Sequence, residues 1–487
     1  MNSSIKLVIS FMLMLVLLLP TGMSSQALTG NLNLDLELDT VIDSNLLQVL
    51  EGGEVAEVIV TFHGDEGVDA TELSLLEDLG LSKIATFESL PMAGLVATKG
   101  QVEALSELDE VLSIYLNEEL EYFNADSTDL TRVDEVRTDE EMRQKNGGLP
   151  VSGSGVGVVV NDSGVDGTHG DHKFGNNLVQ NVLASTNLSS LDNGIFPVTY
   201  IENVVNTDTN SGHGTHVAGT VGGTGAKSSG KYEGVAPGAD LIGYGSGAAI
   251  LVLDGIGGFD YAITNQQRYD IRVVTNSWGG SGDFDPFHPI NIASKKAYDR
   301  GIVSLFAAGN SGPEENTHNP YAKAPWVISV AAGNKDGTLA DFSSRGTDGK
   351  GGTFEMDGEE WEWKDEPTIT APGVDIISTR VIAPLSALAV QDDAEFIDPG
   401  HLPYYTTMSG TSMATPHVAG VVALMLESNP NLSPGEVKKI LQETATPMED
   451  RASWEVGAGY VDAYESVDQA FNYNEEEKTK GNSKGNR

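Results

Sequence analysis

The sequence predicts an α/β protein with a mostly parallel sheet and helices on both of its faces. Continuous apolar runs of strand length recur along the chain, at Gly155–Val160, Val273–Ser277, Ile302–Ala307 and Val327–Ala331. Stretches with helical spacing lie between these runs, at His213–Val221 and Ile290–Asp299. The 56 glycines suit the many tight loops that such a fold needs. Strands that are apolar throughout are typical of a buried parallel sheet, and the intervening helices indicate a layer on each face.

A smaller domain is predicted ahead of this sheet, between Leu28 and Phe123. A β-type run at Glu57–Phe62 precedes Ala70–Leu79, where leucines recur at helical spacing. A hairpin around Pro91, a second helix and a closing strand follow, at Lys83–Glu88, Gly94–Thr98, Lys99–Leu108 and Val111–Tyr115. The order β-α-β-β-α-β predicts a ferredoxin-like α+β unit, and the unit contains no catalytic constellation.

The first residues have the three parts of a secretory signal peptide. Lys6 precedes the apolar run Leu7–Leu19, and small residues follow up to Ala27. The run is too short to span a bilayer, and no later segment is long and apolar enough to do so. We therefore expect residues 1–27 to be removed and the protein to be secreted in soluble, extracellular form.

Composition excludes several classes of function. The chain of 487 residues has no cysteine, which removes disulfides, cysteine nucleophiles and thiolate metal sites. The net charge of −43, from 71 acidic and 28 basic residues, argues against nucleic acid or an anionic membrane as a partner. The acidity itself fits solubility or a saline or alkaline setting.

Four further segments complete the predicted layout. Asn124–Val151 is polar and acidic and predicts a connection into the second domain, which would span 124–473. The acidic insertion Gly349–Glu366, which contains Trp361 and Trp363, predicts an exposed loop or hairpin rather than a metal site. Helices are predicted near the end of the chain at Ser433–Thr444 and Asp462–Phe471. The polar tail 474–487 predicts disorder.

The stretch Gly410–Gly420, Gly-Thr-Ser-Met-Ala-Thr-Pro-His-Val-Ala-Gly, runs into the apolar Val421–Leu426. This pattern predicts a helix with Ser412 at or just inside its N-terminus. Free N–H groups and the helix dipole favour negative charge there, which is what an acyl-transfer nucleophile needs for its oxyanion. Taken alone, the stretch could equally be an ordinary glycine-rich helix entry.

Two other stretches supply partners for such a serine. Val158–His169 contains Asp162 after an apolar run, and Gly212–Thr220 reads Gly-His-Gly-Thr-His-Val-Ala-Gly-Thr. A serine hydroxyl needs a base, and the base needs a carboxylate, so Asp162, His213 and Ser412 can form a triad. A metal-hydrolase cluster is the alternative, built from His169, Asp171, His172, His213 and His216. It leaves Ser412 and Asn310 without a role.

The three stretches resemble the motifs of the subtilisin-like serine proteases, the subtilases or peptidase S8 family, and stand in that family's order. The resemblance extends through Gly234–Pro237, Asn276–Gly280 and Ala307–Asn310, and it covers about Gly155 to Val467. It implies a subtilisin-like fold and a serine endopeptidase that acts on proteins or peptides.

The resemblance also implies a role for individual residues. Asp162 would orient His213, which would act as the general base and then as the acid for attack by Ser412. The Asn310 amide and the Ser412 N–H would form the oxyanion hole. Ser277, Trp278 and Gly279 would pair with an extended substrate, and Ala308 and Gly309 would line the pocket before the cleaved bond. Trp278 is bulkier than the leucine common at this place, which bears on specificity.

The leading domain resembles the inhibitor I9-type propeptide of this family. This implies a zymogen in which residues 28–123 assist folding, inhibit the enzyme from within the chain and are cut off by it near Leu116–Asn124. The alternatives are an interaction domain kept in the mature protein and a catalytically silent binding protein. The resemblance gives no reason to expect an oligomer, so we expect a monomer.

Metal requirements are open at this stage. Asp171 stands where many members of the family place a calcium-binding carboxylate. The segment Gly222–Glu233, however, does not resemble the asparagine-containing loop that completes that site. The implied chemistry requires no cofactor and no catalytic metal, so any calcium ion would be structural.

Overall fold

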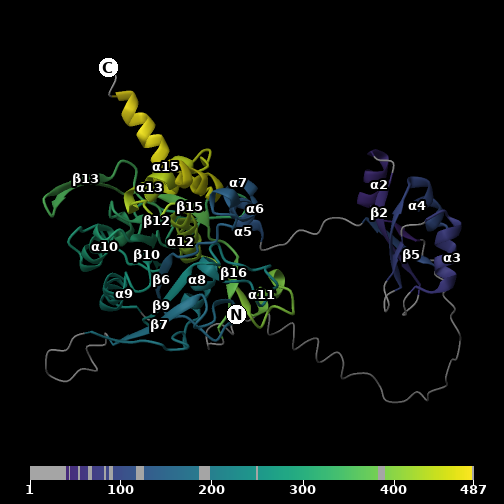
Figure 1. Cartoon of the computed structure of the whole chain (residues 1–487), viewed down its shortest axis with the longest axis horizontal. Coiled ribbons are helices and arrows are strands. Elements are labelled where there is room, and N and C mark those ends of the chain that lie inside the picture. Colours follow the sequence, from purple (N-terminus) through teal and green to yellow (C-terminus); the bar gives the residue numbers. More distant parts are fainter. Residues whose placement is uncertain are drawn as a thin grey trace, which may run out of the picture. The chain divides into compact units, whose positions relative to one another are not determined.

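The computed structural model divides the chain into two compact units, Met1–Leu120 and Glu121–Arg487 (Figure 1). The residues that it describes are 40–42, 44–52, 55–63, 68–81, 84–86, 91–116, 125–185, 198–247, 250–381 and 390–484. The predicted signal peptide and nearly all of the predicted processing segment, 117–124, lie outside these residues.

The first unit is a five-stranded sheet with the strand order β1-β5-β2-β4-β3. Its elements are β1 (Val41–Ile42), α2 (Ser44–Gly52), β2 (Ala56–Phe62), α3 (Ala70–Asp78), β3 (Ile84–Thr86), β4 (Met92–Ala97), α4 (Lys99–Ser106) and β5 (Val111–Leu116). The predicted β-α-β-β-α-β order is present from β2 to β5, and α2 and β1 precede it. Leu46, Val58 and Leu76 are among the buried side chains that form its core.

The larger unit contains an eight-stranded sheet with the order β15-β12-β11-β10-β6-β9-β7-β8. Its strands are β6 (Gly157–Asp162), β7 (Leu178–Ser185), β8 (Thr199–Ile201), β9 (Asp240–Gly245), β10 (Ile271–Asn276), β11 (Val303–Ala307), β12 (Ile328–Gly333) and β15 (Ile369–Pro372). Neighbouring strands are parallel except for β8, which pairs antiparallel with β7. The apolar runs that predicted strands became β6, β10, β11 and β12, so the predicted fold class is confirmed.

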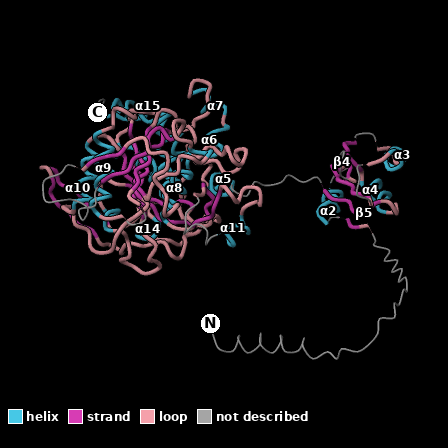
Figure 2. The backbone as a smooth tube through the Cα atoms, turned by 90° about the horizontal axis from the view of Figure 1, so that it is seen from below, coloured by secondary structure: helices cyan, strands magenta, loops and turns pink. Residues whose placement is uncertain are grey.

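Alternation along β6 explains why helices cover both faces of the sheet. Val158 and Val160 pack in one core with α8 (His213–Gly222) and α12 (Thr411–Ser428). Val159 points the other way, into a second core with α9 (Val252–Thr264) and α10 (Pro289–Asp299). Because successive side chains of a strand face opposite sides, a strand that is apolar throughout needs a helix layer on each face. Figure 2 shows the strands of this unit with helices around them.

The predicted connection after the first unit forms three short helices in the structure. They are α5 (Ala125–Leu130), α6 (Val133–Thr138) and α7 (Glu140–Lys145). The hydroxyl of Thr131 lies 2.9 Å from Nε2 of His417 on α12, and both side chains are buried. Arg132 is paired with Asp462 at 2.9 Å. This segment is therefore an integral part of the larger unit rather than a linker.

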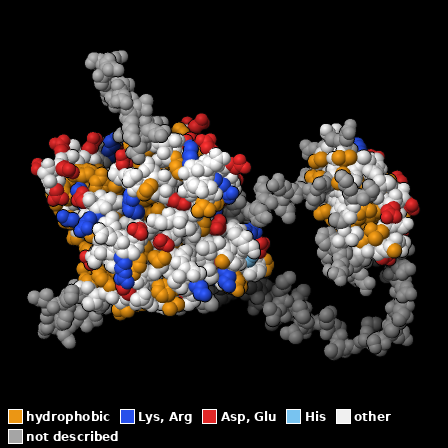
Figure 3. All heavy atoms as spheres, viewed as in Figure 1, with side chains coloured by type: hydrophobic (Ala, Val, Ile, Leu, Met, Phe, Trp, Pro, Cys, Tyr) orange, Lys and Arg blue, Asp and Glu red, His pale blue; other side chains and the backbone are white. Residues whose placement is uncertain are grey.

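The acidic insertion is a hairpin, as expected, with β13 (Gly351–Met356) paired to β14 (Glu359–Lys364). Trp361 lies opposite Phe354 and packs edge-on against Trp326 at 5.3 Å. The aromatic side of the hairpin therefore faces the body of the unit, while its acidic side chains are exposed at the edge of the unit (Figures 1 and 3).

The remaining elements also belong to the larger unit. They are η1 (Gly170–His172), η3 (Pro320–Lys323), β16 (Ile376–Thr379), α11 (Val390–Phe396), β17 (Tyr405–Met408), α13 (Pro434–Thr444), α14 (Ser453–Val456) and α15 (Ala463–Lys484). The disorder predicted for 474–487 was wrong as far as Lys484, because α15 continues to that residue. Its first half is anchored by the buried Val467 and Ala470.

Three buried neutral histidines should make the larger unit sensitive to acid. Burial lowers the pKa of His172, His216 and His417 to about 3, from the usual 6.5. Between these two pKa values the unfolded chain binds more protons than the folded one. The free energy of unfolding is therefore highest above about pH 6.5 and falls as the pH decreases. The free energy of unfolding should fall by up to about 1.4 kcal/mol per pH unit for each ring.

Urea unfolding at pH 8, 7, 6 and 5 checks this expectation. Stability should be nearly constant from pH 8 to 7 and lower at each step below that. An equal free energy of unfolding at pH 5 and pH 8 would contradict it.

Candidate active site

Ser412 is the second residue of helix α12, where the sequence placed it. The cap residue, Gly410, has no side chain, and Oδ1 of Asn310 takes over that role. It accepts hydrogen bonds from the N–H and from the hydroxyl of Thr411, both at 2.9 Å. The N–H of Ser412 belongs to the first turn, where a helix offers no acceptor of its own. No described residue accepts a hydrogen bond from this N–H, so it can serve as a donor next to the Ser412 hydroxyl.

Two reciprocal hydrogen bonds hold the start of α12 against the end of β10. The hydroxyl of Ser412 donates to the carbonyl of Ser277 at 2.9 Å. The hydroxyl of Ser277 donates in turn to the carbonyl of Ser412 at 2.8 Å. In this arrangement the Ser412 hydroxyl points at the backbone of the neighbouring strand, so it must rotate before it can donate to a base.

His213 is the first residue of helix α8, directly after Gly212. Its Nδ1 lies 2.7 Å from Oδ1 of Asp162, the last residue of β6. Asp162 is buried, whereas 32% of the His213 side chain is exposed, so the ring is anchored on one side and open on the other. Burial opposes a charge on this ring, but the carboxylate of Asp162 outweighs it and raises the pKa of His213.

The sheet and the helix packing bring these groups to one edge of the larger unit. Strands β6, β10 and β11 are parallel neighbours, so Asp162, Ser277 and Ala308 all lie at or just beyond their carboxyl ends. Helices α8 and α12, which begin with His213 and Thr411, pack against each other. This is the edge where active sites of open parallel sheets form.

Asn310 lies in the loop after β11 and is exposed. Since its Oδ1 faces Thr411, its Nδ2 group is the part left to donate, and no described residue accepts from it. Gly309 precedes it with φ 109°, a conformation that favours glycine, and donates its N–H to the hydroxyl of Thr411 at 3.2 Å. Ala308 is buried, and its N–H donates a hydrogen bond to the carbonyl of Val330 at 3.0 Å.

The side chain of Trp278 is packed into the unit. Its Nε1 donates to the carbonyl of Asn161 at 2.7 Å, and its ring meets Phe306 edge-on at 5.4 Å. The side chain of Trp278 is thus partly buried against the second core, which favours contacts of an extended ligand with the backbone of Ser277–Gly279.

Sequence reasoning missed Asn319, a buried residue that joins the two stretches expected to bind substrate. Its Nδ2 donates to the carbonyls of Trp278, at 3.2 Å, and of Ala307, at 2.8 Å. A Cβ atom on Gly279 would come within 2.3 Å of Asn319, which explains why a glycine stands there. The only sequence signal was an asparagine before a proline, which is also common in turns.

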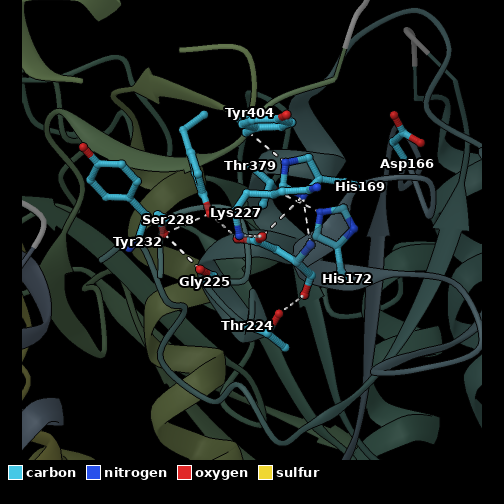
Figure 4. Close-up of polar contacts among 12 residues, drawn as sticks. Asp166, His169, His172, Thr224, Gly225, Lys227, Ser228, Tyr232, Thr379 and Tyr404 are labelled. Atoms are coloured by element: carbon cyan, nitrogen blue, oxygen red, sulfur yellow. Dashed lines mark hydrogen bonds and ion pairs between the residues drawn. The ribbon is translucent and has the colours of Figure 1, made fainter. Parts of the chain in front are cut away.

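The surroundings of Asp171 do not fit a calcium ion (Figure 4). Its carboxylate is fully buried and accepts from the Lys227 N–H at 2.9 Å and from the Tyr405 hydroxyl at 2.6 Å. Its carbonyl accepts from the N–H of Thr224 at 3.0 Å. These partners are hydrogen-bond donors, whereas calcium requires converging oxygen acceptors. The loop therefore satisfies Asp171 with its own N–H and hydroxyl groups.

We propose that calcium does not stabilise the larger unit through Asp171, and we expect a chelator to leave the thermal midpoint of the protein unchanged. Asp171→Asn should instead lower the free energy of unfolding by about 1–3 kcal/mol, since a buried donor would lose its acceptor. Thermal unfolding with and without chelator measures both. A midpoint that falls with chelator and returns with added calcium would contradict the expectation.

The metal-hydrolase alternative finds no support in the side-chain arrangement. His213 faces Asp162, while Nε2 of His216 bonds to the carbonyl of Ile376 at 2.9 Å. His169 bonds to the carbonyl of Tyr404, and His172 to the hydroxyl of Thr379, each at 2.9 Å (Figure 4). Among the described residues no group of three or more His, Asp or Glu side chains is arranged to hold a metal ion. In addition, none of the helices that the structure describes is long and apolar enough to cross a membrane.

Comparisons with known proteins show the family to which the chain is similar. The model of the subtilase family, Peptidase_S8, matches residues 153–473. Serine protease AprX of Bacillus subtilis is 33% identical over 382 residues, which are 74% of this chain and 76% of AprX. Fervidolysin of Fervidobacterium pennivorans is 33% identical over 322 residues, 63% of this chain and 40% of fervidolysin. The solved structure of Sphericase shares 29% identity with a TM-score of 0.49, and the match covers 64% of this chain and 92% of that one.

Proposed function

This chain belongs to the subtilase family and is a serine endopeptidase, and we propose that it cleaves peptide bonds through Asp162, His213 and Ser412. The observation that carries the proposal is the 2.7 Å contact between His213 and the buried Asp162, with Ser412 at the start of the helix packed beside α8. A carboxylate, an imidazole and a serine in these relations are the parts that acyl transfer to serine requires.

In the proposed reaction His213 removes the proton of the Ser412 hydroxyl while the oxygen attacks the scissile carbonyl. The hydroxyl first turns from the Ser277 carbonyl towards His213. The carbonyl oxygen of the substrate becomes an oxyanion, which accepts from the Ser412 N–H and from Nδ2 of Asn310. His213 then protonates the departing amine, and a water molecule activated by the same ring hydrolyses the acyl-enzyme. No cofactor takes part.

We propose that the substrate binds as an extended strand along Ser277–Gly279, by pairing with backbone groups of this segment. Because the Trp278 indole is packed inward, backbone contacts rather than that side chain would provide most of this recognition. Backbone pairing accepts many sequences, so broad cleavage of unfolded proteins is favoured over a single dedicated partner. Casein should be cut at many sites, and cleavage at one site alone would favour the dedicated role.

We also propose that the protein is exported and matures from a precursor. The leader argues for export, and residues 28–123 have the element order of a subtilase propeptide. We expect the cut before Ser127, because this residue is buried and the chain from there onwards packs in the larger unit. Thr131 and Arg132, with their bonds to His417 and Asp462, would remain in the mature enzyme.

Intact mass measurement of the exported protein, wild type beside Ser412→Ala, tests this scheme. The wild type should lose the residues before about Asn124, and the variant should keep residues 28–123 because it cannot cut itself. Equal trimming of both proteins would assign maturation to another protease. If neither protein were trimmed, the first unit would be a permanent domain, and the precursor proposal would fail.

A further inference from the structure

We propose that Asp208, a buried carboxylate outside the proposed triad, is a positioning residue for His213 and stabilises the charged form of its ring. The inference rests on the proposed role of His213 as the general base. It arises from the way in which helix α8 begins.

Helix α8 has no cap of its own at the end that carries His213. Its cap residue is Gly212, with φ 85° and no side chain to receive the free N–H groups of the first turn. Asp208 supplies the missing acceptors from the preceding loop. Oδ1 accepts from the N–H of Gly212 at 2.8 Å, and Oδ2 from the N–H of Thr215 at 3.0 Å. The carboxylate therefore holds the residues on both sides of His213.

Ser163 connects this cap to the proposed triad. Its hydroxyl accepts from the N–H of Gly214 at 2.8 Å and donates to Oδ1 of Asp208 at 3.3 Å. Its own N–H donates to Oδ1 of Asp162 at 2.7 Å, the same oxygen that binds His213. Thus one residue joins both carboxylates, and the backbone around His213 is fixed relative to Asp162.

Asp208 is only 1% exposed and lies at the positive end of the helix dipole, so its charge is poorly screened by water. The groups that act electrostatically on His213 are Asp162 on β6, Asp208 before α8 and the neutral His216 one turn further along α8. Both carboxylates favour the imidazolium. Because catalysis passes through that imidazolium, the second carboxylate should matter for rate as well as for structure.

Asp208→Asn tests the proposal, because it keeps the shape of the side chain and removes its charge. The acid limb of kcat/KM should move to lower pH by about 0.5 unit or more, since the pKa of His213 falls when a nearby negative charge is lost. We expect kcat to fall about tenfold or more while KM changes little, because the substrate does not touch Asp208.

Glu427→Gln is the matched control for a merely structural role. Glu427 lies near the C-terminal end of α12, where its Oε2 accepts from the N–H groups of Ser152, Gly153 and Ser154. Glu427→Gln should lower the thermal midpoint and leave the acid limb of kcat/KM at the pH of the wild type. If both variants lost stability and both kept the wild-type limb, Asp208 would be a structural cap only, and the proposal would be overturned.

Two further measurements keep the test independent of folding and of the proposed function. If Asp208→Asn does not fold, Asp208→Glu is measured instead, because it keeps the charge. Its kcat/KM should have the same acid limb as that of the wild type, and an acid limb shifted to lower pH would contradict the proposal. Titration of the His213 ring by NMR in Ser412→Ala, with and without Asp208→Asn, reads the pKa without any activity. An unchanged pKa there refutes the role of Asp208, whereas peptide hydrolysis by Ser412→Ala alone would refute the proposed function.

Discussion

Replacement of Ser412 by alanine is expected to reduce kcat/KM for peptide hydrolysis by about 10⁴-fold or more. The hydroxyl supplies the attacking oxygen, and no other group near His213 takes its place. The fold should survive, because the Ser412 hydroxyl makes one hydrogen bond among the described residues, to the carbonyl of Ser277. The return bond from the Ser277 hydroxyl to the Ser412 carbonyl remains. Steady-state cleavage of a chromogenic peptide, with thermal unfolding in parallel, measures both expectations.

Ser428→Ala is the control for the loss of a serine from the same helix. Ser428 ends α12, and its hydroxyl donates to the carbonyl of Leu424 at 2.9 Å, far from the proposed site. It should keep the activity of the wild type. If Ser412→Ala kept a kcat/KM within about tenfold of the wild type, Ser412 would be excluded as the nucleophile.

Asp162→Asn is expected to lower kcat by about 10³–10⁴-fold with little change in KM. Oδ1 of Asp162 accepts from both Nδ1 of His213 and the N–H of Ser163, each at 2.7 Å, whereas the buried Oδ2 has no hydrogen-bond partner in the part of the chain that the structure describes. An asparagine can therefore keep its oxygen in the Oδ1 position and place its NH₂ group in the Oδ2 position. The tautomer of His213 is then retained, and the loss reports the missing charge opposite the imidazolium. The pH dependence of kcat checks this interpretation.

Asp166→Asn is the appropriate comparison, because Asp166 is also buried and lies four residues further along the chain. Its Oδ1 accepts from the N–H and the hydroxyl of Thr168, at 2.9 and 2.6 Å, and not from His213. Asp166→Asn should lower kcat by less than about tenfold. If Asp162→Asn were no more harmful than Asp166→Asn, the proposed role of Asp162 would be wrong.

The layout of the sheet and the placement of Ser412 could be predicted because both depend on local patterns. Apolar runs identified β6, β10, β11 and β12, and the small residues before an apolar helix placed Ser412 in the first turn of α12. A carboxylate at the end of a buried strand, Asp162, followed from the same pattern. These signals are each contained in a dozen residues or so of sequence.

Contacts between distant segments could not be predicted in this way. Asp171 and the Tyr405 hydroxyl that it binds are 234 positions apart, so the hydrogen bonds that satisfy this carboxylate could not be read from the sequence. Asn319 and Asp208 act through backbone groups of other segments, and backbone groups leave no trace in sequence. The acidic composition of Asn124–Val151 concealed three helices, because only a few buried residues, among them Val133, Val136 and Met142, anchor them.

Covalent labelling with a fluorophosphonate, which reacts with activated serines, followed by peptide mapping is the most direct test of the central claim that Ser412 is the nucleophile. We predict one adduct per chain on the peptide that contains Ser412, with loss of activity in proportion to labelling. Asp162→Asn should react far more slowly, and Ser412→Ala should not react. An active enzyme that carried its adduct on another residue, or that stayed active while Ser412 was fully modified, would contradict the account.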